Sequence, residues 1–166
     1  MRGCYRRAMS DTVSVQRLLP SAPEPIFDLL ADPDRHADID GGGSVQRARS
    51  GGRRLALGDR FGMDMKLGVA YSMSNTVVEF EENRRIAWQT RGGGPVGKVV
   101  GGRIWRYELE PVEGGTLVTE TWDIREENPL SKPFVRGMAG MTRRNMEATL
   151  ARIEDLVCGH QDATGG

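Results

Sequence analysis

The sequence predicts an α+β domain: a curved antiparallel sheet of about seven strands, two short helices after the first strand, and a long C-terminal helix packed on the sheet. Apolar and polar residues alternate through most of the chain, which is typical of half-buried strands. The C-terminal part changes to the three- and four-residue spacing of an amphipathic helix. Turn residues separate the strands at hairpin distances, which favours an antiparallel meander over a parallel sheet.

The N-terminal elements carry clear start and stop signals. Thr12–Leu19 alternates as a strand, and Ser21–Glu24 resembles a capping box at the start of a short helix. Asp32 as N-cap and Pro33 in the first helical position begin a second short helix, which must stop at the glycines 41–43. The apolar positions of the first helix share one face: Ile26, Phe27, Leu29 and Leu30.

Six further strands follow the glycine run: Ser44–Arg49, Arg60–Leu67, Tyr71–Phe80, Arg85–Thr90, Arg103–Glu110 and Thr116–Ile124. Centring the two clearest hairpin turns predicts which residues lie opposite each other on neighbouring strands. The predicted pairs are Val77 with Trp88, Glu79 with Ile86, Leu109 with Val118, Tyr107 with Glu120, and Trp105 with Trp122. A register slip of one residue would move every side chain to the other face.

After Pro133, apolar residues recur at helical spacing and predict one helix of roughly 25 residues. Its apolar stripe needs a large partner, and the sheet is the only candidate. The stripe consists of Phe134, Met138, Met141, Met146, Leu150, Ile153 and Val157.

The chain length fits one domain, which we expect over residues 11–158 between a disordered leader (1–10) and a disordered tail (159–166). Met9 is an alternative initiator. Cys4 and Cys158 have no CxxC partner, so we expect neither a disulfide nor a zinc site, and a cytoplasmic location. The balance of 23 basic against 23 acidic residues argues against nucleic-acid binding, and no apolar run is long enough for membrane insertion.

Two motifs resemble a known superfamily. Pro23–Pro33 is similar to the opening helix and turn of the START-like helix-grip superfamily (SRPBCC), and Trp105–Pro111 followed by Gly114–Thr119 is similar to its late hairpin. This superfamily includes START lipid-transfer domains, polyketide cyclase/dehydrases and the major birch-pollen allergen. The resemblance covers residues 12–158. It implies a helix-grip fold and a hydrophobic, lipid- or polyketide-like ligand, but it assigns no catalytic residue, because catalytic groups differ between subfamilies.

If the inner face of the sheet is concave, its side chains line a cavity beneath the long helix. Methionine suits an adaptable apolar site, and Tyr and Trp offer a flat face with one polar handle. The alternative is that the same side chains simply fill a core, as the neighbouring Leu109 would. The candidate ligand-binding residues are Phe61, Met63, Met65, Tyr71, Met73, Trp88, Trp105, Tyr107, Trp122, Met138 and Met141.

Three polar residues are candidates for acid–base chemistry. An inward Glu120 beside the Tyr107 hydroxyl could accept a proton, unless a register slip turns it to solvent or an arginine neutralises it. His36 lies near where superfamily members open their cavity, and the alternative is a solvated surface histidine. Asn75 and Asn145 are weaker candidates that we expect to hydrogen-bond locally. We expect no metal and no cofactor.

Neither glycine-rich stretch precedes a helix as a phosphate loop does, so we interpret 41–43 and 92–94 as turns. The loop Arg91–Gly102 either gates the cavity or is an ordinary hairpin loop. Three functions therefore stay open: a carrier of a small hydrophobic molecule, a cyclase/dehydrase-type enzyme, or a protein-interaction module without a ligand. A homodimer is compatible with each.

Overall fold

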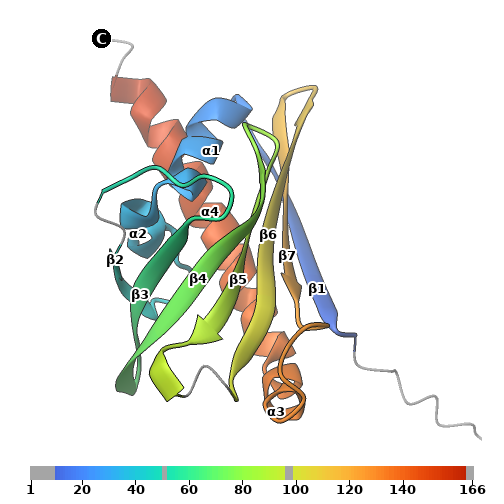
Figure 1. Ribbon diagram of the computed structural model, residues 1–166. Helices are drawn as coiled ribbons and strands as arrows, with labels where there is room; N and C mark the ends of the chain where they lie inside the picture. The colour runs from blue at the N-terminus through green and yellow to red at the C-terminus, as the bar shows by residue number, and fades with distance from the viewer. Residues whose placement is uncertain (1–9, 50–51, 96–98, 164–166) are drawn as a thin grey trace, which may run out of the picture.

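The computed structural model describes residues 10–49, 52–95 and 99–163 (Figure 1). Within them, seven strands form one antiparallel sheet, as predicted, and their order is β1-β7-β6-β5-β4-β3-β2. The strands are β1 (Thr12–Leu19), β2 (Val45–Arg49), β3 (Arg60–Leu67), β4 (Val69–Glu81), β5 (Arg85–Gly92), β6 (Gly101–Val112) and β7 (Gly115–Asp123). Because β1 pairs with the last strand, the N-terminal strand forms one edge of the sheet, and β2 forms the other edge.

The helices lie on one side of this sheet, and α4 crosses its inner face (Figure 1). They are α1 (Pro23–Ala31), the 3₁₀ turn η1 (Pro33–Arg35), α2 (His36–Ile39), α3 (Lys132–Gly137) and α4 (Ala139–Ala163). The buried stripe of α4 packs into the core cluster through Met146, Leu150, Ile153 and Val157. None of the helices described is long and apolar enough to cross a membrane.

The short N-terminal helices begin differently from each other. Asp32 caps η1 as predicted, since its carboxylate accepts the backbone N–H of Asp34 at 3.0 Å. The predicted capping box of α1 is wrong: the N-cap is Ala22, and the Ser21 hydroxyl donates to the Ala22 carbonyl instead. Pro23 occupies the first turn and has no N–H to satisfy, which lessens the need for a side-chain cap.

The predicted single C-terminal helix is in fact two. The helix is interrupted at Met138, whose N–H donates to the Val135 carbonyl and so forms a tighter turn. Gly137 and Gly140 flank the break, and glycine weakens a helix at both positions. As a result Phe134 is 76% exposed and does not join the predicted stripe.

At its other end, α4 continues to Ala163, past the boundary that we expected after Cys158. Residues 160–163 include no proline or β-branched side chain, so nothing in the sequence ends the helix directly after Gly159. Residues 1–9 of the expected leader (1–10) and residues 164–166 of the expected tail lie outside the described residues.

The strand pairs of the two hairpins agree with the predicted pairs except at one β-bulge. Tyr107 lies opposite Glu120, and the other predicted pairs of that hairpin are also present. Val77 lies opposite Trp88, but a β-bulge at Val78 then places Glu79 opposite Ala87 and not Ile86. The extra residue turns Glu79 to the outer face of the sheet, where its carboxylate binds Arg106.

Candidate ligand-binding cavity

A cavity of about 300 Å³ lies between the inner face of the sheet and α4. Its walls come from α2, the α2–β2 loop, strands β2 to β7 and the first turns of α4. Ten of the predicted ligand-binding residues line it: Met63, Met65, Tyr71, Met73, Trp88, Trp105, Tyr107, Trp122, Met138 and Met141. That they bind a ligand stays a prediction, but the structure brings them to one place.

The exception is Phe61, which is buried in the core and does not line the cavity. Its ring contacts His36 and Trp88 edge-on at centroid distances of 5.5 Å and 5.9 Å. Phe61 therefore supports the cavity wall from behind. Leu109 is also core only.

The cavity lining is rich in tryptophan and methionine. All three tryptophans and six of the eight methionines line the cavity; one of them is Met146, which was predicted only as part of the helix stripe. Met1 and Met9 lie outside the described residues. Flexible, polarizable side chains are thus concentrated around one empty volume.

Glu120 is inside the sheet, 1% exposed, and the Tyr107 hydroxyl donates to its Oε1 at 2.8 Å. The alternative solvent-facing placement is wrong, because the hairpin keeps the register that points both residues inward. Burial raises the pKa of Glu120 from 4.5 to about 8; the Tyr107 hydrogen bond opposes this rise and the charge of Asp40 adds to it. Burial likewise raises the pKa of Tyr107. The carboxyl group is therefore mostly protonated at neutral pH.

His36 is also buried, at 3% exposure, so its alternative as a solvated surface histidine is wrong. Its ring stacks on Trp88 with 4.9 Å between centroids, and Nε2 lies 2.8 Å from the Leu30 carbonyl. A carbonyl only accepts hydrogen bonds, so Nε2 carries the proton and Nδ1 presents a lone pair. Burial lowers the pKa of His36, which keeps the ring neutral.

Asn75 lines the cavity beside Thr90, which lies opposite it on β5. The Thr90 hydroxyl donates to Asn75 Oδ1 at 2.6 Å, which confirms the expected local hydrogen bond. Asn145 lines the cavity from α4, and its backbone carbonyl accepts from the Thr149 hydroxyl.

An ion pair in the cavity wall was not predicted from the sequence. Arg103 lines the wall on β6 and is bound by Glu127, whose side chain is completely buried. Glu127 also accepts the backbone N–H groups of Gly101 and Arg103 and the Ser131 hydroxyl. One carboxylate thus ties the start of β6 to the segment that leads into α3. A charged pair between two separate segments leaves no periodic signal in the sequence.

In the α2–β2 loop, close packing requires glycine at Gly41, whereas Gly43 has open space around it and a φ of 65°, which favours glycine. The Gly41 N–H donates to the Thr149 hydroxyl on α4, and a side chain at Gly41 would overlap the backbone of Asn145. Asp40 then holds the loop through the N–H groups of Gly42 and Val45. This run brings the loop against α4 and so closes one wall of the cavity.

The residues that line the cavity do not support the predicted gate at Arg91–Gly102. Residues 96–98 lie outside the described part of the chain, and the described residues between Arg91 and Gly102 do not line the cavity. Gating by this loop stays a prediction.

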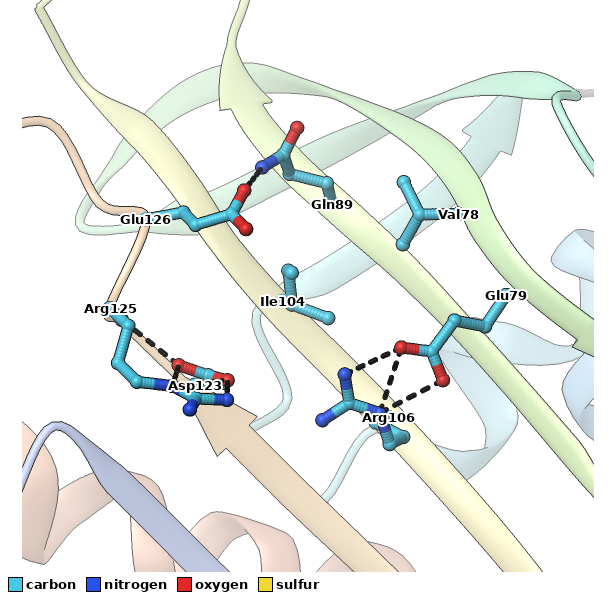
Figure 2. A pocket seen from close by; sticks show the side chains of 8 residues that line it. All are labelled: Val78, Glu79, Gln89, Ile104, Arg106, Asp123, Arg125 and Glu126. Carbon is cyan, nitrogen blue, oxygen red and sulfur yellow. Dashed lines mark hydrogen bonds and ion pairs between the residues drawn. The ribbon is translucent and has the colours of Figure 1, made fainter.

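A second depression, of about 570 Å³, lies on the opposite face of the sheet (Figure 2). Its charged side chains point toward one another: Arg106 binds Glu79, Arg125 binds Asp123, and Gln89 binds Glu126. Arg106 holds the pKa of Glu79 below its usual value. Since these groups satisfy each other, the inner cavity is the better candidate site. No group of three possible metal ligands occurs among the described residues.

A curled antiparallel sheet that holds a long C-terminal helix against its inner face defines the helix-grip class of α+β proteins. Within this class, the chain belongs to the polyketide cyclase / dehydrase and lipid transport family, which its residues 10–157 match. Rv0088, an uncharacterized protein of Mycobacterium tuberculosis strain H37Rv, is 32% identical over 148 residues, covering 86% of this chain and 61% of that protein. A second M. tuberculosis strain has a 31% identical counterpart. The chain spans about three fifths of these relatives.

Solved structures share the fold at low identity. StfQ, a di-domain ARO/CYC protein from the steffimycin biosynthetic pathway, matches with a TM-score of 0.71 and 13% identity, over 91% of this chain and 51% of its own. CV1439 from Chromobacterium violaceum matches with a TM-score of 0.66 and 17% identity, over 89% of this chain and 96% of its own. At these identities the likeness shows the fold alone.

Proposed function

We propose that this protein binds a small, mostly apolar molecule in the cavity between the sheet and α4. The observation that carries the proposal is the empty volume of about 300 Å³ lined by three tryptophans and six methionines. This volume is at the lower end of the range found for small-molecule pockets. A ligand of about two fused rings is an appropriate size for it.

The alternative that these side chains only form a core fits the volume poorly. Protein cores are packed about as densely as organic crystals, with few voids larger than a water molecule. A void destabilises the fold in proportion to its size, because the atoms around it lose contacts. An occupant would restore those contacts and stabilise the protein.

Thermal unfolding with tetralin, an uncharged bicyclic hydrocarbon, tests the proposal. A ligand present at a hundred times its Kd adds about 2.7 kcal/mol. For a domain of this size that corresponds to a Tm increase of about 5–10 °C. Met73→Trp should fill the cavity and abolish the increase. The neighbouring Ser74→Trp, on the exposed outer face of β4, should preserve it. Equal Tm increases in both variants, or none in the parent protein, would contradict the proposal.

The contact between Tyr107 and Glu120 favours one second candidate function, an enzyme that transfers a proton inside the cavity. The family includes cyclases and dehydrases, and StfQ is an ARO/CYC protein. A protonated Glu120 could donate its proton to a departing hydroxyl group or to a carbonyl oxygen of a bound chain. Tyr107 would then stabilise the carboxylate that forms.

Glu120→Gln separates the two candidate functions. Glutamine keeps a hydrogen-bond donor at this position but has no acidic proton to give. An enzyme that uses Glu120 should therefore lose turnover of a polyketide-type substrate, with a smaller change in its affinity. A turnover rate equal to that of the parent would remove Glu120 from the chemistry.

A further inference from the structure

Among the described residues that line the cavity, Arg103 is the only arginine or lysine. Its side chain shares the inner face of β6 with Trp105 and Tyr107, because residues two apart on a strand point to the same side. Only 15% of this side chain is exposed. A charged group in a mostly apolar wall needs partners for its N–H donors, since losing water without replacing it is costly.

Glu127 is a partner for one edge of the guanidinium group. Nε and Nη2 of Arg103 donate to the two carboxylate oxygens at 3.1 Å and 3.3 Å. The planar group has five N–H donors, so the second edge, formed by Nη1 and the other N–H of Nη2, is unused. No hydrogen bond from Nη1 is found within the described part of the chain, and Nη1 is not one of the fully buried unpaired atoms there. This second edge is therefore open to a ligand.

Glu127 holds the guanidinium group in place without depending on it alone. Its carboxylate also accepts the backbone N–H groups of Gly101 and Arg103 and the Ser131 hydroxyl. These donors fix the carboxylate and stabilise its charge. The bidentate contact then sets the plane of the arginine fork, so Glu127 is a positioning residue for the open edge.

A second charged side chain in the wall gives the cavity a direction. Asp40, on the α2–β2 loop, adds to the rise in the pKa of both Tyr107 and Glu120, so its charge acts on that part of the cavity. Along β6, Tyr107 and Arg103 are four residues apart, which is roughly 13 Å. A negative group on a ligand is therefore repelled near Asp40 and attracted near Arg103.

We infer that the cavity binds an apolar molecule that carries a carboxylate, whose oxygens accept from the open edge of Arg103 while Glu127 positions the fork. The inference rests on the proposed binding function and adds the ligand's head group to it. Two parallel N–H donors match a carboxylate in shape and charge. An ammonium group has no acceptor at this edge, and a hydrocarbon leaves the edge unpaired.

Four bicyclic probes that share one ring system test the inference: tetralin, tetralin-2-carboxylate, tetralin-2-carboxamide and 2-aminotetralin. They carry no polar group, a negative group, a neutral polar group and a positive group. Their Kd values are measured by calorimetry at pH 7.5. The carboxylate should bind about ten-fold more tightly than the carboxamide, since a hydrogen bond to a charged partner is about twice as strong as one between neutral groups. The amine should bind most weakly.

The outcomes separate the inference from the proposed function. Equal Kd values for the carboxylate and the carboxamide, or tightest binding of the amine, would overturn the inference, and cavity binding would still stand. If none of the four probes bound, the proposed function would fail and the inference with it.

A pair of double variants locates the carboxylate preference. Arg103→Met with Glu127→Gln removes both charges together, and glutamine still offers an oxygen to the backbone N–H groups. It should lose the ten-fold preference and keep the tetralin Kd within about two-fold. Arg106→Met with Glu79→Gln removes the matching ion pair on the outer face of the sheet and should keep the preference. A preference that survives in the first double variant, or is lost equally in both, would overturn the assignment to Arg103.

The ionisation of the bound probe gives a test that needs no variant. Tetralin-2-carboxylic acid labelled with ¹³C at the carboxyl group is titrated by nuclear magnetic resonance, free and bound to the parent protein. Beside Arg103, the pKa of the bound acid should fall below that of the free acid. A carboxyl group buried away from Arg103 would have a raised pKa, and that result would overturn the inference.

Discussion

Tyr107 and Glu120 lie directly opposite each other on β6 and β7, and their 2.8 Å hydrogen bond joins the most buried acidic side chain of the cavity wall to a buried phenol. The pair sits in an antiparallel hairpin, where residues opposite each other share a face. The position of Glu120 is therefore set by the register of two strands. Its protonation state is set by the apolar residues around it.

The first prediction concerns stability against pH. Burial raises the pKa of Glu120 from 4.5 to about 8, so between these values the folded state keeps a proton that the unfolded chain has lost. The free energy of unfolding should therefore fall as pH rises through this range, by up to about 1.4 kcal/mol per pH unit. Glu120→Gln lacks this proton, so its advantage over the parent should grow from pH 5 to pH 8. Urea unfolding of both proteins at several pH values measures this difference in the free energy of unfolding. A difference that does not change with pH would contradict the raised pKa.

A second prediction isolates the hydrogen bond between the pair. Tyr107→Phe removes the donor to Glu120 Oε1 and should destabilise the fold by about 1–2 kcal/mol, because a buried oxygen loses its partner. Tyr71→Phe is the matched control, since Tyr71 is 42% exposed, and should change stability by less than about 0.5 kcal/mol. Chemical denaturation at pH 6.5 compares the two. Similar losses in both variants would show that the phenol at 107 has no special role.

Glu127 gives a third prediction. Its buried carboxylate binds Arg103, two backbone N–H groups and Ser131, so Glu127→Ala should leave a partly buried guanidinium and two backbone N–H groups without their partner. Breaking a buried pair in this way costs about 3–5 kcal/mol. The exposed neighbour Glu126, which binds Gln89, serves as the control, and Glu126→Ala should cost less than about 1 kcal/mol. Thermal unfolding of both variants tests the difference.

A fourth prediction contrasts two glycines. Gly41→Ala would push a methyl group into the backbone of α4 and should destabilise the fold by about 1–3 kcal/mol. Gly140→Ala, in the first turn of α4, where an added Cβ would meet no neighbouring element within 4 Å, should stabilise it by about 0.4–1 kcal/mol. The opposite signs, measured by Tm, would establish that Gly41 is a packing contact. A neutral Gly41→Ala would contradict this explanation.

The sequence predicted the strands well because their alternation has a period of two and glycine-rich turns separate them. It also predicted the register of the hairpin that contains Tyr107 and Glu120, since that hairpin has no bulge. The bulge at Val78 was missed, because one extra residue in a long strand leaves the overall pattern intact. The helix break at Met138 was missed because apolar spacing continues across it.

His36 shows a different limit of sequence reasoning. It lies in a four-residue helix, which is too short to show which side of it is buried. Its position is determined by tertiary packing against Phe61 and Trp88, two side chains from distant strands. The concentration of methionine and tryptophan was visible in the composition, but only the fold shows that these residues surround one volume.

Nuclear magnetic resonance of the methionine methyl groups tests the central claim most directly. Protein labelled with ¹³C at the methionine methyls is titrated with tetralin. If the cavity binds the probe, the resonances of Met63, Met65, Met73, Met138, Met141 and Met146 should shift together and saturate with one Kd. In Met73→Trp, the resonances of the other five methionines should not shift when tetralin is added. Resonances that do not move in the parent protein, or that move equally in Met73→Trp, would contradict a ligand-binding cavity.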